Sequence, residues 1–320
     1  MKIVVYGDER RVGAWEQGRV IDLARAQERH GVRGMTLAAQ LPAFIAAGRQ
    51  GLETARRVVE SARGDEPGDG VVFEDHEVSL HAPWPGRRIA CVGGNFADHL
   101  LGMQLTRAGE TPLTLEQVRN RERTFDPWGF WKVPADVVGP GGTVPYPRRT
   151  QYLDYEGEPA IVLGARGKDI AAGDYKAYVW GVTLLNDGSL RDGPSGQPPR
   201  GLSYNLAKNF DGSTAIGPCI VVDEVDPENI VVETRINGEL RQQFNSRDMI
   251  FSWGEVLAYL SRDFTWVPGD IISGGTAAGT AADKTPRGPD GSRSSALFLK
   301  RRDVVEISSP DIGALRFEIV

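Results

Sequence analysis

The chain has 320 residues, of which 40% are hydrophobic and 25% charged; this length and composition suit two lobes and exclude a disordered chain or a disulfide-stabilised miniprotein. Its 37 basic and 43 acidic residues give a net charge of -6 without a long basic run, which disfavours nucleic acid as a partner. Apolar runs fall far short of the ~20 residues that cross a bilayer, the amino terminus does not resemble a signal peptide, and the two cysteines lack a metal or redox spacing, so we expect a cytoplasmic protein that does not bind membranes.

Residues 1–85 are predicted to form a small N-terminal α/β domain, with a boundary at the prolines near residue 85. Short β-type runs predict a small hairpin sheet, and apolar residues at helical spacing predict two helices. The expected elements are strands at residues 3–6 and 18–23, a helix that is capped by Thr36 and stopped by Gly48, and a helix over residues 52–62.

The rest of the chain, residues 86–320, is predicted to be mostly sheet, because short β-type runs alternate with Gly and Pro. Asn237-Gly238 supplies the two positive-φ positions of a tight hairpin turn. Ser252, with Glu255 three residues later, predicts a capped helix that ends near residue 261. The expected strands cover residues 89–92, 153–163, 179–185, 220–222, 231–236 and 271–272.

A polar insertion that carries aromatic residues spans residues 102–132. Thr114 followed by Gln117 predicts a short capped helix within it. A segment of this kind beside a site is either a lid that closes over substrate or a plain surface insertion. The sequence leaves both interpretations open.

Two glutamates, Glu156 and Glu158, stand two residues apart in a predicted strand, so their carboxylates project from the same face. The apolar residues after them continue that face into the interior, where two like charges need a cation or a proton between them. Asp187 ends another apolar run and would complete an oxygen-rich site for Mg²⁺, Mn²⁺ or Ca²⁺. Zinc is disfavoured because neither His nor Cys accompanies these carboxylates. Taken alone, the glutamate pair is also typical of an exposed strand edge, and Asp187 alone is also typical of a turn after a buried strand.

A series of spaced motifs follows in the second domain: RRIACVGGNFADH (87–99), DYEGEPAIVLG (154–164), GVTLLNDGSLRD (181–192), AKNFDGSTAIGP (207–218), the NGE hairpin, and PGDIISGGTAAG (268–279). In kind and order these motifs resemble the fumarylacetoacetate hydrolase superfamily. The resemblance implies an α+β, mainly β fold: a mixed β-sandwich roll as catalytic domain 86–320, preceded by the small N-terminal domain 1–85. It also implies a divalent metal at the mouth of the roll and a homodimer.

Position by position, the resemblance implies roles for particular side chains. The three carboxylates of the spacing argument become the metal ligands, and His99 becomes the general base. Each of the other residues, seen alone, is more often a surface charge, a loop residue or a satisfied core histidine. The implied assignment is Glu156, Glu158 and Asp187 for the metal, His99 and Lys208 for catalysis, and Arg191, Thr276 and Lys208 for substrate binding.

The chain also departs from the pattern of this superfamily. A Glu that often follows the base histidine by three residues is replaced by Gly102, so the acid–base pair is incomplete. Glu110, Glu116 or Glu122 of the insertion are the alternatives that would replace it. Gly94 stands where an Arg is frequent, and Gly193-Pro194 stand where a Gln is common. We therefore expect a different mode of substrate carboxylate recognition.

The resemblance implies a metal-dependent hydrolase that cleaves a carbon–carbon bond in an acylpyruvate-type or other β-diketo acid, through an enolate that the cation stabilises. The same enolate would serve a 2-oxo acid decarboxylase, an isomerase or a hydratase/dehydratase. A metal-binding scaffold without turnover is a further alternative. We expect Mg²⁺ or Mn²⁺, with Ca²⁺ as an alternative, and a small 2-oxo or diketo acid as substrate.

Overall fold

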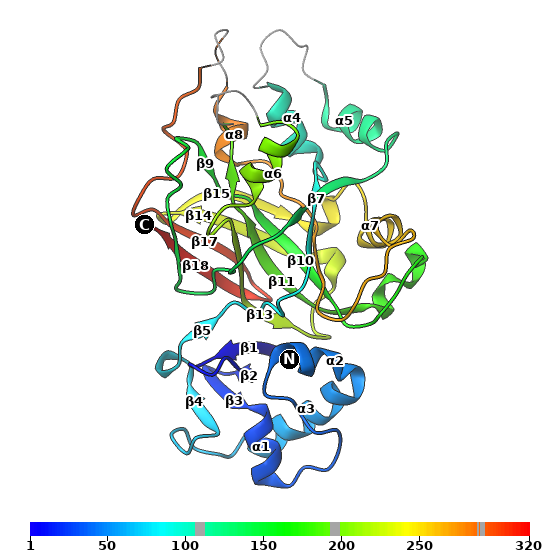
Figure 1. Ribbon diagram of the computed structural model, residues 1–320, viewed down its shortest axis with the longest axis vertical. Coiled ribbons are helices and arrows are strands. Elements are labelled where there is room, and N and C mark those ends of the chain that lie inside the picture. The colour runs from blue at the N-terminus through cyan, green and yellow to red at the C-terminus, as the bar shows by residue number, and fades with distance from the viewer. Residues whose placement is uncertain (106–112, 193–198, 287, 289–291) are drawn as a thin grey trace.

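The computed structural model describes residues 1–105, 113–192, 199–286, 288 and 292–320. Figure 1 shows a small N-terminal lobe, in blue, beneath a larger lobe that contains most of the strands. The fold is α+β and mainly β, as the sequence predicts. Within the described ranges, no helix combines the length and the apolar character that a bilayer crossing requires.

The N-terminal lobe is an antiparallel meander that packs against helices. Strands β1 to β4 pair in chain order, and β5 pairs with the end of β1. The elements are β1 (Lys2–Tyr6), β2 (Arg11–Glu16), β3 (Arg19–Asp22), α1 (Leu23–His30), α2 (Leu41–Ala46), α3 (Gly48–Ala62), β4 (Val72–Glu74) and β5 (Leu80–His81).

Three expectations for this lobe are wrong in detail. The strands expected at 3–6 and 18–23 exist, but β2 lies between them and α1 follows directly. The helix expected from Thr36 begins only at Leu41, because Gln27 accepts the backbone N–H of Leu37 and holds the preceding segment in another conformation. The helix expected over 52–62 begins earlier, at Gly48, whereas α2 ends at Ala46, just before Gly48 with its φ of 56°, as expected.

The larger lobe adds the rest of an eleven-stranded sheet and a second, five-stranded sheet. The first has the order β4-β3-β2-β1-β13-β11-β10-β16-β6-β7, and the second β15-β14-β17-β18-β8. The strands are β6 (Ile89–Gly93), β7 (Trp128–Lys132), β8 (Thr143–Val144), β9 (Leu153–Asp154), β10 (Gly157–Leu163), β11 (Val179–Asp187), β12 (Ser189–Leu190), β13 (Thr214–Val221), β14 (Val231–Ile236), β15 (Glu239–Asn245), β16 (Ile271–Ser273), β17 (Val304–Ser309) and β18 (Gly313–Ile319).

Helices close one end of the larger lobe, at the top of Figure 1, where α4, α6 and α8 lie near one another. Capping boxes begin α5 at Thr114 and α7 at Ser252, and both confirm the sequence prediction. The predicted hairpin is also present, with Asn237 and Gly238 at φ of 52° and 84°. The helices are α4 (Ala97–Leu105), α5 (Leu115–Glu122), α6 (Leu202–Lys208), α7 (Trp253–Leu260) and α8 (Ala281–Lys284).

The strand expected over 153–163 is broken, and the break shapes the site. β9 pairs with β12, whereas β10 pairs with β11 and β16. Between them, the N–H of Glu156 donates to the Asn186 side chain and its carbonyl accepts the N–H of Asp187 at 2.9 Å. Glu156 therefore leaves the regular ladder but stays tied to the end of β11.

Two hydrophobic cores lie on opposite faces of the large sheet. Ile161 and Leu163 of β10 belong to the core shared with the five-stranded sheet, whereas Ala160 and Val162 belong to the core shared with α2 and α3. Because β1 pairs with β13, the sheet is continuous between the predicted domains 1–85 and 86–320. That division of the chain stays a prediction.

Candidate active site

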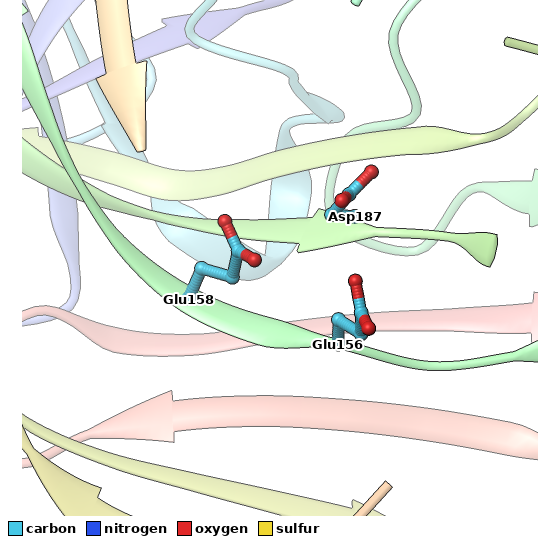
Figure 2. Close-up of side chains that lie close together, drawn as sticks. All are labelled: Glu156, Glu158 and Asp187. Carbon is cyan, nitrogen blue, oxygen red and sulfur yellow. The ribbon is translucent and has the colours of Figure 1, made fainter. Parts of the chain in front are cut away.

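Three buried carboxylates meet where β10 begins and β11 ends. The two strands are antiparallel, with Glu158 opposite Leu185 and Gly157 opposite Asn186, so Glu156, Glu158 and Asp187 come from the same end of the pair. Figure 2 shows the three carboxylates on one side of these strands. One oxygen from each lies within 4.8 Å of the others. The sequence spacing is thus realised as a compact cluster inside the protein, and not as an exposed strand edge.

Cationic side chains surround this cluster. The Lys208 Nζ donates to Glu156 and to Asp187, at 2.6 Å each, and the Arg191 guanidinium donates to Glu156 and to Asp154. Burial alone would raise the pKa of Glu156, but Arg191 and Lys208 hold it well below its usual range. Burial and the neighbouring Asp187 and Glu156 carboxylates raise the pKa of Glu158 well above its usual range. The surroundings of Glu158 therefore disfavour its negative charge unless a proton or a cation is bound there.

The residues present fit a hard divalent cation. The donors are oxygen atoms only, they are buried, and their separation suits shared coordination. Each carboxylate is also oriented by a second contact: Glu156 by Arg191, Glu158 by the Ser273 hydroxyl, and Asp187 by Lys132. Two like-charged buried carboxylates beside a third are otherwise unfavourable. The identity of the ion stays a prediction.

A cavity of about 460 Å³ opens beside the carboxylates. Its wall combines apolar side chains, among them Leu100, Trp128 and Phe130, with polar groups that converge at the carboxylates. An apolar cleft with a few convergent polar groups is typical of a small-molecule site. All of the site residues predicted from the sequence line this one cavity: His99, Glu156, Glu158, Asp187, Arg191, Lys208 and Thr276.

The predicted substrate-binding residues have structural contacts of their own. Arg191 is directed at Asp154 and Glu156, as described above. The Thr276 hydroxyl donates to the Gly157 carbonyl at 2.9 Å and accepts from Gln242 at 2.8 Å. Both residues therefore stabilise the segment that carries Glu156 and Gly157. Their role in binding substrate stays a prediction.

His99 lies on α4 and lines the same cavity. Its Nδ1 lies 3.0 Å from Asp283 Oδ2. Burial alone would lower the pKa of His99, but the charge and hydrogen bond of Asp283 and the charge of Glu156 raise it. His99 therefore has the environment of an imidazole that binds a proton readily, and its role as base stays a prediction.

The proposed substitutes for a partner glutamate do not include the residue that His99 contacts. Glu116 is exposed, and Glu122 pairs with Arg121. Glu110 lies outside the described residues, as do Gly193-Pro194 and part of the predicted lid at 102–132. Gly94 lines the cavity with φ of 60°.

Sequence reasoning missed Lys132 and Asp283. Lys132 ends β7, and its Nζ donates to Asp187 at 2.7 Å and to the Ser213 carbonyl at 3.1 Å. A lysine after an aromatic strand gives no local sign of this contact. One local pattern does point to Asp283: it follows Thr280 by the spacing of a capping box, and the structure contains that box.

Known proteins share both the sequence pattern and the fold of this chain. Residues 88–320 match the family described as fumarylacetoacetate (FAA) hydrolase C-terminal. The oxaloacetate tautomerase YisK of Bacillus subtilis (strain 168) is 33% identical over 308 residues, which are 94% of this chain and 93% of that protein. The mitochondrial oxaloacetate tautomerase FAHD2B of Homo sapiens is 30% identical over 289 residues, 89% and 81% of the two chains.

Solved structures agree. The fumarylacetoacetate hydrolase EaFAH from psychrophilic Exiguobacterium antarcticum has a TM-score of 0.72 at 28% identity, over 100% of this chain and 99% of that one. A probable 2-hydroxyhepta-2,4-diene-1,7-dioate isomerase from Mycobacterium abscessus has a TM-score of 0.70 at 26% identity, over 100% and 98%. With a family match over most of its length, relatives that are enzymes and neighbours of the same fold, the chain belongs to the fumarylacetoacetate hydrolase family.

Proposed function

We propose that this protein is a divalent-metal-dependent tautomerase that interconverts the keto and enol forms of a small 2-oxo acid of the oxaloacetate type. The observation that carries the proposal is the placement of three buried carboxylates and His99 on the wall of one cavity. The names of the relatives favour this reaction, since two of them that cover most of this chain are oxaloacetate tautomerases.

Glu156, Glu158 and Asp187 would hold Mg²⁺ or Mn²⁺, with Ca²⁺ as an alternative. When bound, such a cation supplies Lewis acidity that lowers the free energy of negative charge developing on a carbonyl oxygen. Lys208 lies between Glu156 and Asp187, and its ammonium group adds a second positive charge at the same end of the cavity. This end therefore suits the anionic head of a 2-oxo acid.

Tautomerisation requires a proton to leave the carbon next to the carbonyl and another to reach the oxygen. His99 is the base and acid that we assign to the carbon, because it lines the same cavity as the carboxylates. The conversion consumes no water and breaks no carbon–carbon bond, so substrate and product have the same composition. The apolar wall around Leu100 and Phe130 would limit the access of water to the enol.

Hydrolytic cleavage of a β-diketo acid, the first expectation from the sequence, is the second candidate. It is favoured by the structural likeness to EaFAH, which is named as a fumarylacetoacetate hydrolase. In that reaction His99 would deprotonate a water molecule that attacks one carbonyl, and the same enolate would leave as the carbon–carbon bond breaks.

One assay separates the candidates. The protein is stripped with EDTA, reloaded with Mg²⁺ or Mn²⁺, and given oxaloacetate, acylpyruvates and other diketo acids. Loss of enol absorbance, carbon dioxide release and acid products are measured together. We expect metal-dependent keto–enol exchange without new acids. Metal-dependent formation of two acids would favour hydrolysis instead, and a protein that gains no thermal stability from either metal or oxalate would contradict an active site of this kind.

The same proposal includes a homodimer in the cytoplasm. Four of the exposed large apolar side chains, Phe125, Trp128, Trp131 and Val133, lie on or beside β7. In the described sheet β7 pairs only with β6, and the Asn209 side chain accepts the Val133 N–H and donates to the Trp131 carbonyl. A second copy of the chain, placed against this apolar surface, would cover it.

A further inference from the structure

We infer that Asp283 is a positioning residue that sets the tautomer and orientation of His99 for proton transfer. The inference rests on the proposed function for the reaction that it affects, but its structural content is independent of that reaction. It concerns a contact between α4 and α8, two helices that lie side by side at the top of Figure 1.

The contact determines which nitrogen of His99 carries a proton. Asp283 Oδ2 lies 3.0 Å from His99 Nδ1, and an ionised carboxylate only accepts hydrogen bonds. Nδ1 must therefore carry the hydrogen. In the neutral ring Nε2 then has the free lone pair, and Nε2 is the nitrogen that remains for the cavity that His99 lines.

Asp283 is itself held firmly. The backbone N–H groups of Gly279 and Thr280 donate to Oδ2 at 3.1 and 3.2 Å, and the side chain is only 3% exposed. The other oxygen, Oδ1, is buried and has no hydrogen-bond partner in the described part of the chain. A buried carboxylate with one unsatisfied oxygen is costly, and a protonated His99, in contact with Oδ2, would offset the charge of the carboxylate.

A glycine makes room for this approach. Gly102 follows His99 by one helical turn on α4, and a Cβ at that position would lie 2.9 Å from Asp283 Cβ and 3.2 Å from its Cγ. Any side chain at residue 102 would therefore push α8 away from His99. The missing side chain on α4 and the carboxylate on α8 are complementary, so Asp283 reaches the histidine from a different element.

The charged groups that face His99 come from several elements. Asp283 on α8 and Glu156 before β10 favour its protonated form, whereas Arg191 after β12 opposes it. On its own helix, Asp98 accepts the backbone N–H of His99. Arg293 also lines the cavity. Asp283 is the carboxylate in direct contact with the ring. Its removal should therefore change the protonation and orientation of His99 more than removal of any other group outside the carboxylate cluster.

The test uses the metal-loaded full chain and four variants: Asp283→Asn, Asp283→Glu, His99→Ala and the double variant His99→Ala/Asp283→Asn. A matched control is Asp65→Asn, because Asp65 Oδ2 contacts His30 Nε2 at 2.7 Å in the N-terminal lobe, far along the chain from the site. Ring resonances of the four histidines are titrated by NMR, and kcat and kcat/KM for keto–enol exchange are measured against pH. Circular dichroism and the Mn²⁺-induced rise in Tm check folding and metal binding.

We expect Asp283→Asn to lower kcat about 10- to 100-fold, the usual cost of removing a carboxylate that orients a functional histidine, while the Mn²⁺ response stays intact. Loss of the carboxylate charge destabilises the imidazolium, so the His99 titration and the rising limb of the pH profile move to lower pH. Asp283→Glu should restore part of the rate. In the His99→Ala background, Asp283→Asn should cause no further loss, because Asp283 acts through His99.

An unchanged His99 titration in Asp283→Asn, or equal slowing of the wild type and of His99→Ala by that substitution, would overturn the inference. If Asp65→Asn alters the rate as much as Asp283→Asn does, the effect is not local and the inference fails as well. If the wild type catalyses no exchange, the proposed function fails, but the His99 titration still decides whether Asp283 positions the ring.

Discussion

At the scale of single residues, the site consists of buried charges in mutual contact. Lys208 bridges Glu156 and Asp187, Arg191 bridges Glu156 and Asp154, and Lys132 contacts Asp187. Removing one member of such a set leaves its partner buried and unpaired, which is costly by itself. Isosteric neutral substitutions are therefore more informative than truncation to alanine.

Glu158→Gln is the most informative change at the carboxylates. Burial and the neighbouring carboxylates raise the pKa of Glu158 and so favour its neutral form, so a neutral amide there should not lower the stability of the metal-free protein, and its carbonyl can still accept from Ser273. We expect loss of metal-dependent activity and of the Mn²⁺-induced rise in Tm. Glu116→Gln, an exposed position on α5, serves as control. Full activity in Glu158→Gln would refute its assignment as a ligand.

Gly102→Ala tests the space between α4 and α8. Alanine is favoured over glycine within a helix by about 1 kcal/mol, but here its Cβ would meet the Asp283 side chain. We expect activity to fall on the order of tenfold, because displacement of a catalytic contact by ~1 Å costs up to about 10²-fold. Gly173→Ala places a Cβ in open space and should leave the rate unchanged. Wild-type activity in Gly102→Ala would show that the two helices separate without consequence.

At the scale of secondary structure, one buried aspartate joins four elements of the N-terminal lobe. Asp22 ends β3 and caps α1 by accepting the Arg25 N–H at 2.9 Å, while Tyr6 of β1 donates to it at 2.6 Å and Arg11 of β2 at 3.0 Å. Burial alone would raise the pKa of Asp22, but these donors lower it below its ordinary range.

The sign of that shift predicts acid sensitivity. A carboxyl with a lower pKa in the folded state stabilises the fold fully above its unfolded pKa of about 3.9, and this contribution is lost as pH falls through the folded value. We expect Asp22→Asn to lower the free energy of unfolding by on the order of 3 kcal/mol at neutral pH, and the difference from wild type to shrink in acid. Urea unfolding at pH 7 and pH 3 measures it, with the exposed Asp8→Asn as control. A difference independent of pH would contradict this account.

At the scale of the whole molecule, the apolar surface on and beside β7 resembles an interface. Val133 is 73% exposed and Phe125 63%, and large exposed apolar side chains that lie close together favour association. We expect Val133→Glu to convert the proposed dimer to monomer, as measured by sedimentation velocity. Leu240→Glu introduces the same charge at an exposed residue of β15 and should not change the assembly. A wild type that sediments as a monomer would contradict the dimer.

Features that depend on residues close together in the chain follow from the amino-acid sequence alone. The Asn237-Gly238 hairpin follows from two positive-φ positions, and the capping boxes at Thr114 and Ser252 from a spacing of three residues. The apolar residues at alternate positions after Glu158 likewise place its carboxylate at the end of a buried face of the strand. With the spaced motifs, this was enough to predict the family, the fold class and a cluster of three carboxylates.

Which distant groups share that cavity depends on the three-dimensional packing of the whole chain. Lys132 meets Asp187 across 55 residues, and His99 meets Asp283 across 184. No local pattern specifies such pairs, because they depend on how strands and helices pack once the whole chain has folded. The break in the strand at Glu156 has the same origin. Its backbone groups form hydrogen bonds with Asn186 and Asp187 on the neighbouring strand, and residues 153–163 alone do not predict these bonds.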